Sequence, residues 1–487
     1  MESISKLRAQ KLKKINRIKA LGLEVYPLTS KRTFEIGEIL KNFSKLSSKK
    51  EEIIIAGRIK AMRSHGSMTF LDIEGQTGKI QAFFEKNKLG EKGYLFFQEN
   101  FDIGDFIEIS GVLFKTKQGE KTVEVRNFRI LSKALLPLPA KWHGFKDIEE
   151  RYRKRYLDLI MNEKIREKFE LRSKIIKEIR NFLERQGFLE VETPILQPLY
   201  GGAKAEPFKT HLKAFKMDMY LRISPELYLK RLLVGGFEKI FEIGKCFRNE
   251  GVDRFHNPDF TMIEFYWAYA DYKKLMQLTE KLFGAILKKL FRKPEVNYAG
   301  KTINFASPWK RIEFQEIFRK FTSLNLENIN EEKLKLEAKK QGIEIRKGED
   351  KNEIADKIFK KLCQPKIFEP TFIIHHPSDK SSLAKTLEQN PKKLASFQLI
   401  AGGWELVWAY SELNNPIEQR KRFEKQKKLM KAGFKEAHPL DEDFIEALEY
   451  GMPPAAGFGM GIDRLVALLT DSHSLREVIL FPIMRPK

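Results

Sequence analysis

The chain has 487 residues, of which 42% are hydrophobic, so it can bury a sizeable core, and we expect two domains. No uncharged apolar run approaches the ~18 residues that a membrane span requires, so we predict no membrane association. Lysine and arginine outnumber aspartate and glutamate by 24, which favours a polyanionic partner, with ordinary surface lysine as the alternative. Cys246 and Cys363 form no CxxC pair, and the polar start MESISKLRAQ contains no apolar signal segment. Both observations predict a cytoplasmic protein without structural zinc.

The first expected element is a basic amphipathic helix over residues 3–25, which ends near Gly22. Leu7, Ile15 and Ile18 recur among many lysines and arginines. Such a helix can lie on RNA, or its charged face can simply be solvated. The sequence leaves both alternatives open.

Short alternating stretches follow from Glu52 to about Ser132 and are separated by glycine turns such as Gly104 and Gly119. The stretches are IIIAGRI, SMTFLDI, KIQAFF, DFIEISGVLF and KTVEVRNFRIL. Five strands without a long helix predict an OB barrel, a fold that binds single-stranded nucleic acid by stacking bases on aromatic side chains.

A segment with two prolines, residues 134–145, is typical of an interdomain linker. We therefore predict one domain over residues 1–140 and a second over residues 141–487. The second begins with a long amphipathic helix that Gly187 ends, followed by a strand, FLEVETPIL, that contains Pro194. The apolar positions of the helix are Ile165, Phe169, Ile175, Ile176, Ile179 and Phe182.

Residues 239–269 predict two strands joined by a charged loop. In the first strand Glu242, Cys246 and Arg248 share one face, and Phe241, Ile243 and Phe247 share the other. In the second, Met262, Glu264 and Tyr266 face away from Ile263, Phe265 and Trp267. The loop carries Glu250, Asp253, Arg254 and His256, which favours a site for a polar ligand. A cross-strand salt-bridge ladder is the alternative.

FRNEG…HNPDFTMIE in this hairpin resembles the second signature motif of class II aminoacyl-tRNA synthetases, in the form found in lysyl-tRNA synthetases. The helix, strand and Pro194 before it resemble the first motif, whose usual role is dimerisation. GFGMGIDRLVALL, residues 457–469, resembles the third. The resemblance extends from about residue 50 to the C-terminus. It implies an α+β protein with an N-terminal OB barrel and a class II antiparallel sheet flanked by helices.

The resemblance also implies an ATP site. Arg248 would clamp the α-phosphate and the amino-acid carboxylate, for which a planar guanidinium is suited. Glu250 and His256 match ATP contacts, and Phe260 matches the aromatic residue on which adenine stacks. Arg464, at the start of a helix, would meet the γ-phosphate. The family often has an arginine where this chain has Phe255, and Arg254 is a candidate to replace it.

An amino-acid pocket is implied by three further stretches. GGAKAEPF, residues 201–208, is similar to the loop that closes over the amino acid and contributes Gly202. YLRISPELYLKR, expected to be a strand, offers Glu226 for the α-amino group. In SFQLIAGGWELVWAYSELNN, Glu412 matches the partner of the lysine ammonium. The other implied lysine-binding residues are Arg248, Glu264, Tyr266 and Tyr410.

The same stretch implies a Mg²⁺ site with Glu405 as one ligand. Gln398 stands where the family has its second metal-binding glutamate, and Trp408 stands where it usually has a substrate-binding asparagine. Glutamine can still coordinate a cation through its carbonyl, but without charge. In the barrel, Phe70 and Gln81 match the anticodon-reading pair, with Arg58 of the AGR stretch nearby.

The expected function is therefore ATP-dependent attachment of lysine to tRNA(Lys) through a lysyl-adenylate, by a homodimer. The departures at Gln398 and Trp408 favour one alternative, a tRNA-binding paralogue with impaired catalysis. Enzymes that lysylate proteins lack the OB domain, and an aspartate or asparagine ligase would need a basic group in the pocket. Residues 325–361 are rich in lysine and glutamate, and they indicate no site.

Overall fold

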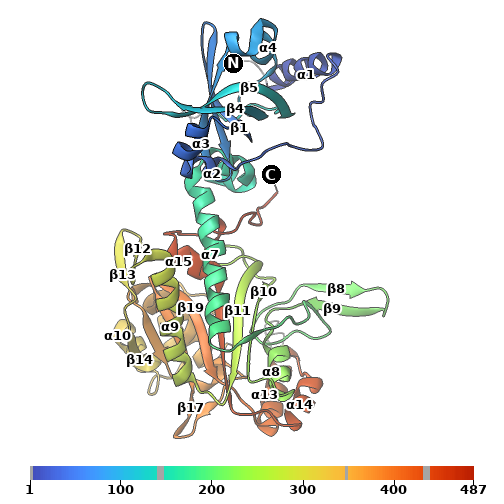
Figure 1. Ribbon diagram of the computed structural model, residues 1–487. Helices are drawn as coiled ribbons and strands as arrows, with labels where there is room; N and C mark the ends of the chain where they lie inside the picture. Colours follow the sequence, from blue (N-terminus) through green and yellow to red (C-terminus); the bar gives the residue numbers. More distant parts are fainter. Residues whose placement is uncertain (1–3, 140–146, 346–348, 432–438, 487) are drawn as a thin grey trace. The chain divides into compact units, whose positions relative to one another are not determined.

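Figure 1 shows the computed structural model, which describes residues 4–139, 147–345, 349–431 and 439–486. The chain divides into two compact units, residues 1–146 and 147–487. Our sequence boundary lies after residue 140, and residues 140–145 of the expected linker lie outside the described residues. No helix in the described ranges is long and apolar enough to cross a membrane.

The N-terminal unit is a closed five-stranded barrel with the strand order β1-β2-β3-β5-β4, which confirms the predicted OB fold. Side chains that alternate along each strand fill the barrel, among them Leu71, Ile73, Ile80 and Phe84. The strands are β1 (Ile53–His65), β2 (Met68–Gly75), β3 (Gly78–Glu85), β4 (Phe106–Lys115) and β5 (Lys121–Ser132).

Contrary to our expectation, a 15-residue helix, α4 (Lys86–Asn100), connects β3 to β4. It buries Tyr94 and Phe97 three residues apart, and Phe97 stacks on Phe84 with ring centroids 4.1 Å apart. The glycines of its first half, Gly90 and Gly93, weaken the helical pattern in the sequence. Two shorter helices, α2 (Ile36–Lys41) and α3 (Phe43–Lys49), precede the barrel.

The basic N-terminal helix is α1 (Ile4–Ala20), and its buried side chains include Ile15 and Ile18. Lys14 pairs with Asp102 of the barrel unit at 2.8 Å, and Arg17 pairs with Glu99 at 3.2 Å. Two of the positive charges of α1 are therefore paired with carboxylates of its own unit. Leu12 is exposed, so the helix is not covered on every side.

The second unit contains an eight-stranded sheet with the order β14-β15-β18-β19-β20-β11-β10-β6. Neighbouring strands are antiparallel except the pairs β14–β15 and β10–β6. In this order the strands are β14 (Lys310–Glu313), β15 (Thr371–Ile374), β18 (Ser396–Ala401), β19 (Trp404–Ser411), β20 (Ala455–Gly461), β11 (Asp259–Ala268), β10 (Lys239–Phe247) and β6 (Leu189–Glu190).

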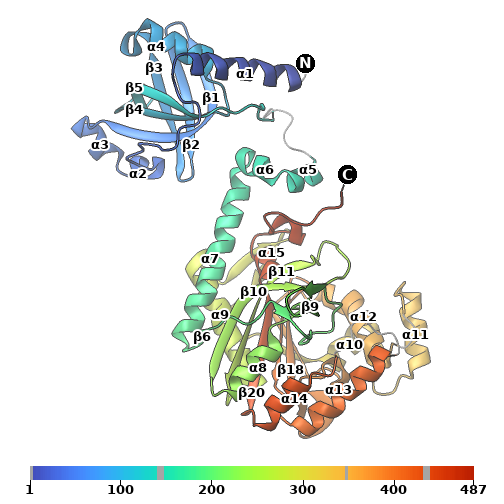
Figure 2. The ribbon, with the colours of Figure 1, turned by 90° about the vertical axis from the view of Figure 1, so that its right-hand side faces the viewer.

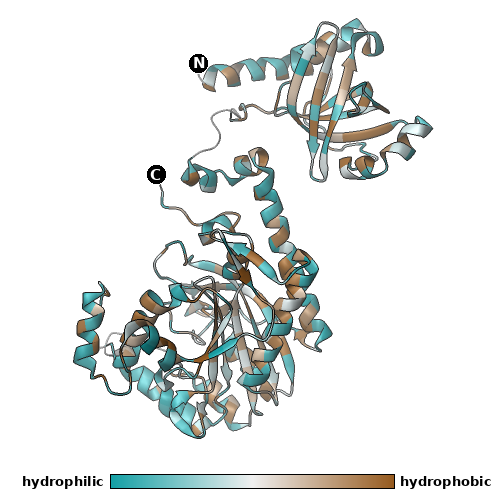
Figure 3. Cartoon of the chain, turned by 90° about the vertical axis from the view of Figure 1, so that its left-hand side faces the viewer, coloured by the Kyte–Doolittle hydropathy of each residue, from teal (hydrophilic) through white to brown (hydrophobic). Residues whose placement is uncertain are grey.

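Helices cover both faces of this sheet (Figure 2). On one face α7 (Glu163–Arg185), α9 (Tyr272–Phe291) and α15 (Ile462–Leu469) pack on Phe265 and Phe458 in the main core. On the other face α8 (Glu226–Val234), α13 (Pro416–Lys431) and α14 (Glu442–Glu449) form a smaller core with Ile240. In Figure 3 the strands of the sheet are largely hydrophobic, while hydrophilic residues predominate on the outer helices.

The remaining elements surround the sheet. The lysine- and glutamate-rich segment forms α11 (Glu331–Lys340), α12 (Lys351–Ile358) and a π-helical turn (Phe359–Cys363), which pack with α10 (Phe314–Thr322) in a core of their own. The other α-helices are α5 (Ile148–Arg153) and α6 (Arg155–Met161), and short 3₁₀ helices span Gln364–Lys366, Ser378–Lys380 and Leu475–Glu477. The other strands are β7 (Leu196–Gln197), β8 (Lys209–Leu212), β9 (Met217–Leu221), β12 (Glu295–Tyr298), β13 (Lys301–Asn304), β16 (Thr386–Leu387) and β17 (Asn390–Leu394).

Two local predictions were wrong. The expected strand at residues 188–196 is reduced to β6 and β7, because Pro194 lies between them and cannot donate a ladder hydrogen bond. Glu226 is the first residue of helix α8 and does not lie in a strand. It follows Pro225, and a proline at the start of a helix needs no hydrogen-bond partner.

Candidate active site

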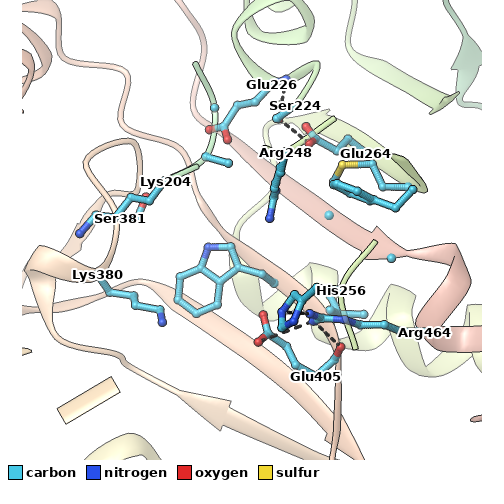
Figure 4. A pocket seen from close by; sticks show the side chains of 18 of the residues that line it. Lys204, Ser224, Glu226, Arg248, His256, Glu264, Lys380, Ser381, Glu405 and Arg464 are labelled. Atoms are coloured by element: carbon cyan, nitrogen blue, oxygen red, sulfur yellow. Dashed lines mark hydrogen bonds and ion pairs between the residues drawn. The ribbon is translucent and has the colours of Figure 1, made fainter. Parts of the chain in front are cut away.

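The predicted hairpin is β10 and β11, with Glu242 opposite Glu264 and Phe241 opposite Phe265. This register confirms the two faces that we read from the sequence. The Phe265 face packs on α7 and α9, and the Glu264 face lines a cavity of about 480 Å³ (Figure 4). Strands β11, β19 and β20 form the floor of the cavity, and residues 202–204, α12 and residues 379–383 line its sides.

One end of the cavity is acidic. Glu264 accepts hydrogen bonds from the Ser224 hydroxyl at 2.6 Å and from the Tyr266 hydroxyl at 3.0 Å. Glu226 accepts from the Tyr410 hydroxyl at 2.6 Å. The oxygens of Glu264 are thus engaged by hydroxyl groups, and the face is not a cross-strand salt-bridge ladder.

An internal lysine lies in the same acidic end. Lys230, four residues after Glu226 on α8, donates to Glu226 at 2.6 Å and also pairs with Glu412. Glu412 and Lys230 have fully buried side chains and do not line the cavity, whereas Glu226, Glu264, Tyr266 and Tyr410 do. Glu412 therefore lies beneath the floor, and a ligand ammonium would have to approach it beside Lys230.

Burial raises the pKa of Glu264 to about 8, and the nearby Glu226 carboxylate adds to the effect. Burial also raises the pKa of Glu412 well above its usual range, although Lys230 opposes this. The empty acidic end therefore retains a proton at neutral pH. A cationic ligand would displace it, because a nearby positive charge favours the ionised carboxylate.

Two glycines allow this close packing. A Cβ at Gly457 of β20 would collide with Glu412 Oε1 and with the Tyr266 ring. Gly202 has φ +88°, and a Cβ there would lie 2.7 Å from the Ser224 hydroxyl. Only glycine satisfies both the positive φ and the close approach at this position.

Arg248 lies between the acidic end and the rest of the cavity (Figure 4). Its guanidinium carbon is 5.0 Å from the centroid of the Phe260 ring, and its backbone N–H donates to the Pro258 carbonyl at 2.9 Å. Its buried Nε has no hydrogen-bond partner among the described residues. This donor remains available for an oxyanion.

At the opposite, cationic end of the cavity, Arg464, Lys360 and Lys380 contribute to the lining. Arg464, the third residue of α15, donates to the Glu405 carbonyl at 3.2 Å, and its guanidinium lies 3.9 Å from Glu405 Oε2. His256 lies 3.5 Å from Arg464 and is oriented by Asp253 at 3.0 Å. Glu250 also lines the cavity and is exposed. The arrangement suits a polyphosphate beside its fixed cations.

The segment in which the sequence indicated no site contributes one wall of the cavity. From α12 and its continuation, Asn352, Glu353, Asp356 and Lys360 line it. Lys380 reaches in from the facing loop and pairs with Asp356. Enclosure lowers the pKa of Lys380, against the attraction of Asp356. The i, i+4 pair of Asp356 and Lys360 was the available signal in the sequence, but such pairs are common on solvated helices.

Comparison with known proteins agrees with this geometry. Residues 147–485 match the family of class II tRNA synthetases (D, K and N), and residues 53–131 match the OB-fold nucleic acid binding domain. A lysine–tRNA ligase from Carboxydothermus hydrogenoformans is 48% identical over 100% of this chain and 99% of its own length. The lysine–tRNA ligase from Pelotomaculum thermopropionicum is 47% identical over 100% of this chain and 96% of its own length. The one from Thermotoga maritima is 44% identical over 99% of this chain and 97% of its own length. The chain belongs to the lysine–tRNA ligases.

Within this family a Mg²⁺ site is expected, and the residues present fit it in part. The Glu405 carboxylate lines the cavity and is a suitable hard ligand. Gln398 does not line the cavity, and its carbonyl lies 3.4 Å from His376 Nε2. Burial lowers the pKa of His376 to about 3, so its ring is neutral and donates to Gln398. Arg254 likewise lies outside the lining and stacks on Phe255 at 4.4 Å.

In the barrel of this lysine–tRNA ligase, β2 pairs with β3 so that Phe70 is opposite Phe83 and Asp72 is opposite Gln81. Phe70 and Gln81 therefore project from the same outer face, and Phe70 is half-buried rather than part of the core. Both side chains have partners within the barrel. The Phe70 and Phe83 ring centroids are 5.0 Å apart, and the Gln81 amide oxygen accepts a hydrogen bond from the Thr122 hydroxyl at 2.9 Å.

Arg58 lies at the far end of this face. It is opposite Glu74, donates to the Gly104 carbonyl at 2.8 Å and stacks on Phe106 at 4.2 Å. Arg63 lies directly opposite Phe70 instead. The two arginines are five positions apart, an odd number, so a regular strand would put them on opposite faces. A bulge between Ile59 and Ala61 brings both to the outer face, and the sequence pattern does not reveal it.

Proposed function

We propose that this chain activates L-lysine with ATP to form lysyl-adenylate and then transfers the lysyl group to tRNA(Lys). The single observation that carries the proposal is the charge of the acidic end. Glu226, Glu264 and Glu412 together exceed Lys230 and Arg248 by one negative charge when all are ionised. L-Lysine, with two ammonium groups and one carboxylate, carries one net positive charge and would neutralise the pocket.

The position of each group supports a division of roles. Glu226 and Glu264 would hold the α-amino group, and Glu412, beside Lys230, would meet the side-chain ammonium with Tyr266 and Tyr410. The carboxylate would then lie toward Arg248, between the acidic and the cationic ends. A lysine bound in the reverse direction would place its carboxylate among three glutamates, which the charges disfavour.

Activation follows from this placement. The lysine carboxylate attacks the α-phosphorus of ATP in line, a new P–O bond forms, and the bond to pyrophosphate breaks. Arg248 holds the carboxylate and α-phosphate together, Phe260 stacks on adenine, and His256, Glu250 and Arg464 hold the remaining parts of ATP. Mg²⁺ would be held by Glu405 and phosphate oxygens, and it would neutralise phosphate charge. The terminal ribose hydroxyl of tRNA then attacks the lysyl carbonyl and releases AMP, with no covalent enzyme intermediate.

The outer face of the barrel is the proposed anticodon site. Phe70 offers an aromatic ring for base stacking, and Gln81 offers an amide for a base edge. We add Arg63 to this set because it lies opposite Phe70, at 2.9 Å from Asp72. Arg58 is engaged with Gly104 and Phe106, and we assign it a supporting role.

We also propose that the chain works in the cytoplasm as a homodimer. The edge strand β6 of the sheet carries Leu189, which is 51% exposed, and further exposed apolar side chains lie in the segments that follow β6 and precede β10. The others are Ile195, Leu196, Leu199 and Phe237. An uncovered strand edge with apolar neighbours favours association with a second copy.

Exchange of labelled pyrophosphate into ATP tests the function. We expect exchange that depends on L-lysine, and acceptance of lysine by tRNA(Lys) in a charging assay. Exchange with aspartate or asparagine instead would assign a different amino acid. Binding of tRNA without exchange by any amino acid would support the paralogue with impaired catalysis, the alternative that the departures at Gln398 and Trp408 raised.

A further inference from the structure

A column of side chains stands between Gln398 and the cavity. Gln398 and Trp408 are opposite each other on β18 and β19, so their side chains lie on the same face of the sheet. The His376 ring bonds Gln398 and meets the Trp408 ring edge-on at 4.7 Å. The Lys380 ammonium lies over the Trp408 ring at 5.9 Å. Of this column, the Trp408 ring and the Lys380 ammonium line the cavity, whereas His376 and the amide of Gln398 do not.

Asp356 holds this ammonium in place. One of its carboxylate oxygens pairs with Lys380, and the other lies 3.0 Å from Lys360. The Lys380 side chain is 24% exposed and the Lys360 side chain 52% exposed, so both can meet a ligand in the cavity. Asp356, Lys360 and Lys380 together carry one net positive charge, and Glu353 of the same wall pairs with Lys204 at 3.4 Å.

Glu405 lies between this wall and Arg464. It is close enough to both lysines to stabilise their charge, and Arg464 lies 3.9 Å from its carboxylate. In Figure 4 Lys380 and Glu405 reach into the same part of the cavity. Lys360, Lys380 and Arg464 thus carry one positive charge more than Glu405 and Asp356 at the end where the phosphates of ATP would lie, and Glu250, which also lines this end, is exposed to solvent. An ammonium has three rotatable donors and binds phosphate oxygens as a point charge.

We propose that Lys380, oriented by Asp356 and Trp408 and assisted by Lys360, binds the phosphates of ATP and supplies charge that a second protein-held divalent cation would otherwise supply. Glu405 then serves one Mg²⁺, which arrives with the nucleotide. Trp408 and His376 separate position 398 from the cavity, so a carboxylate at this position would not reach the ligand. The same two rings leave the Lys380 ammonium beside the cavity. This inference rests on the proposed function, because it assumes ATP as the ligand.

The test measures binding of a non-hydrolysable ATP analogue to the full chain by calorimetry over a series of free Mg²⁺ concentrations, without lysine. We expect the wild type to take up one Mg²⁺ with the nucleotide. Lys380→Met should weaken binding about tenfold at low Mg²⁺, as for a lost charge-assisted hydrogen bond, and the loss should shrink as Mg²⁺ rises. Lys380→Arg keeps the charge and should retain most of the affinity.

Lys392→Met is the matched control, because Lys392 is an exposed lysine outside the cavity lining. It should bind as the wild type does. If the pair of Lys380 and Asp356 only joins α12 to the facing loop, Lys380→Met will lower the melting temperature but leave Mg²⁺ dependence unchanged. That result would overturn the inference. So would two Mg²⁺ ions taken up by the wild type.

A second readout separates this inference from the proposed function. Lysine-dependent pyrophosphate exchange by the wild type at saturating Mg²⁺ tests the function alone. If no exchange occurs, the function is wrong, whatever Lys380 does. If exchange occurs and Lys380→Met binds the analogue normally at low Mg²⁺, the function stands and the role of Lys380 is rejected.

Discussion

Lys230 donates a 2.6 Å hydrogen bond to Glu226 in a pocket that we assign to lysine. The chain thus places its own ammonium beside the carboxylates that would receive the substrate. Because Lys230 also pairs with Glu412, it reduces the repulsion among three buried carboxylates while the pocket is empty. The three carboxylates carry one charge more than Lys230 and Arg248 together, and lysine specificity would depend on this excess negative charge.

Lys230→Met should destabilise the second unit by about 3 kcal/mol, because it leaves two buried carboxylates without their cation. Denaturant unfolding followed by tryptophan fluorescence would measure the loss. Glu412→Gln alone should weaken lysine binding far more than ATP binding. In the double variant, part of the stability should return, since one of the uncompensated charges is gone. Additive losses in the double variant would contradict a coupled pair.

The raised pKa of Glu264, about 8, predicts that lysine binding releases a proton. The ordinary pKa of a glutamate is 4.5. At pH values between 4.5 and about 8, Glu264 is protonated in the empty folded protein and ionised in the lysine-bound protein. Lysine affinity should therefore rise with pH up to about 8 and then level off. In the same pH range the empty folded protein holds this proton and the unfolded chain does not. The free energy of unfolding should therefore fall as pH rises from 4.5 to about 8.

Calorimetry in two buffers with different ionisation enthalpies would count the released protons at neutral pH. Glu264→Gln keeps the shape of the side chain and should abolish most of the release. An equal proton count for this variant and the wild type would assign the proton to another group, such as Glu412.

Phe70→Ala should raise the KM for tRNA about tenfold, since stacking on an aromatic ring is worth ~1–3 kcal/mol per base. Pyrophosphate exchange without tRNA should remain unchanged, because Phe70 lies in the barrel unit. Phe96→Ala serves as the matched aromatic control, because Phe96 is a half-buried ring of α4 that packs on Phe101 and Phe128 and not on Phe70 or Arg58. Charging by Phe70→Ala at the wild-type rate and KM would remove Phe70 from the anticodon site.

Arg63→Ala should impair tRNA charging more than Arg58→Ala, because Arg63 lies opposite Phe70 while Arg58 bonds Gly104. Both variants should retain lysine-dependent exchange. Filter binding of tRNA(Lys) at several salt concentrations would compare them, and loss of a phosphate contact should reduce the salt dependence for Arg63→Ala. A larger defect for Arg58→Ala would restore the residue that the sequence favoured.

Local periodicity in the sequence determined much of this protein. Alternation along residues 239–269 was enough to assign Glu264 and Phe265 to opposite faces, because side chains in a strand point to alternate sides. The buried positions of α7 were predicted from the helical spacing of its apolar residues, and the strands of the barrel were predicted from the alternation of apolar and polar residues. The carboxylates and arginines of the site could also be named, since they lie in short motifs of adjacent residues.

Only the tertiary structure decided which of these groups meet. Glu226 and Glu412 are far apart in the chain, and they share Lys230 only because α8 packs under β19 and β20. Asp356 and Lys380 come from different elements, and neither local pattern indicates the other. A one-residue bulge in β1 moved Arg63 to the face of Phe70. Such contacts depend on long-range packing and on register, which the alternation of apolar and polar residues within one segment does not encode.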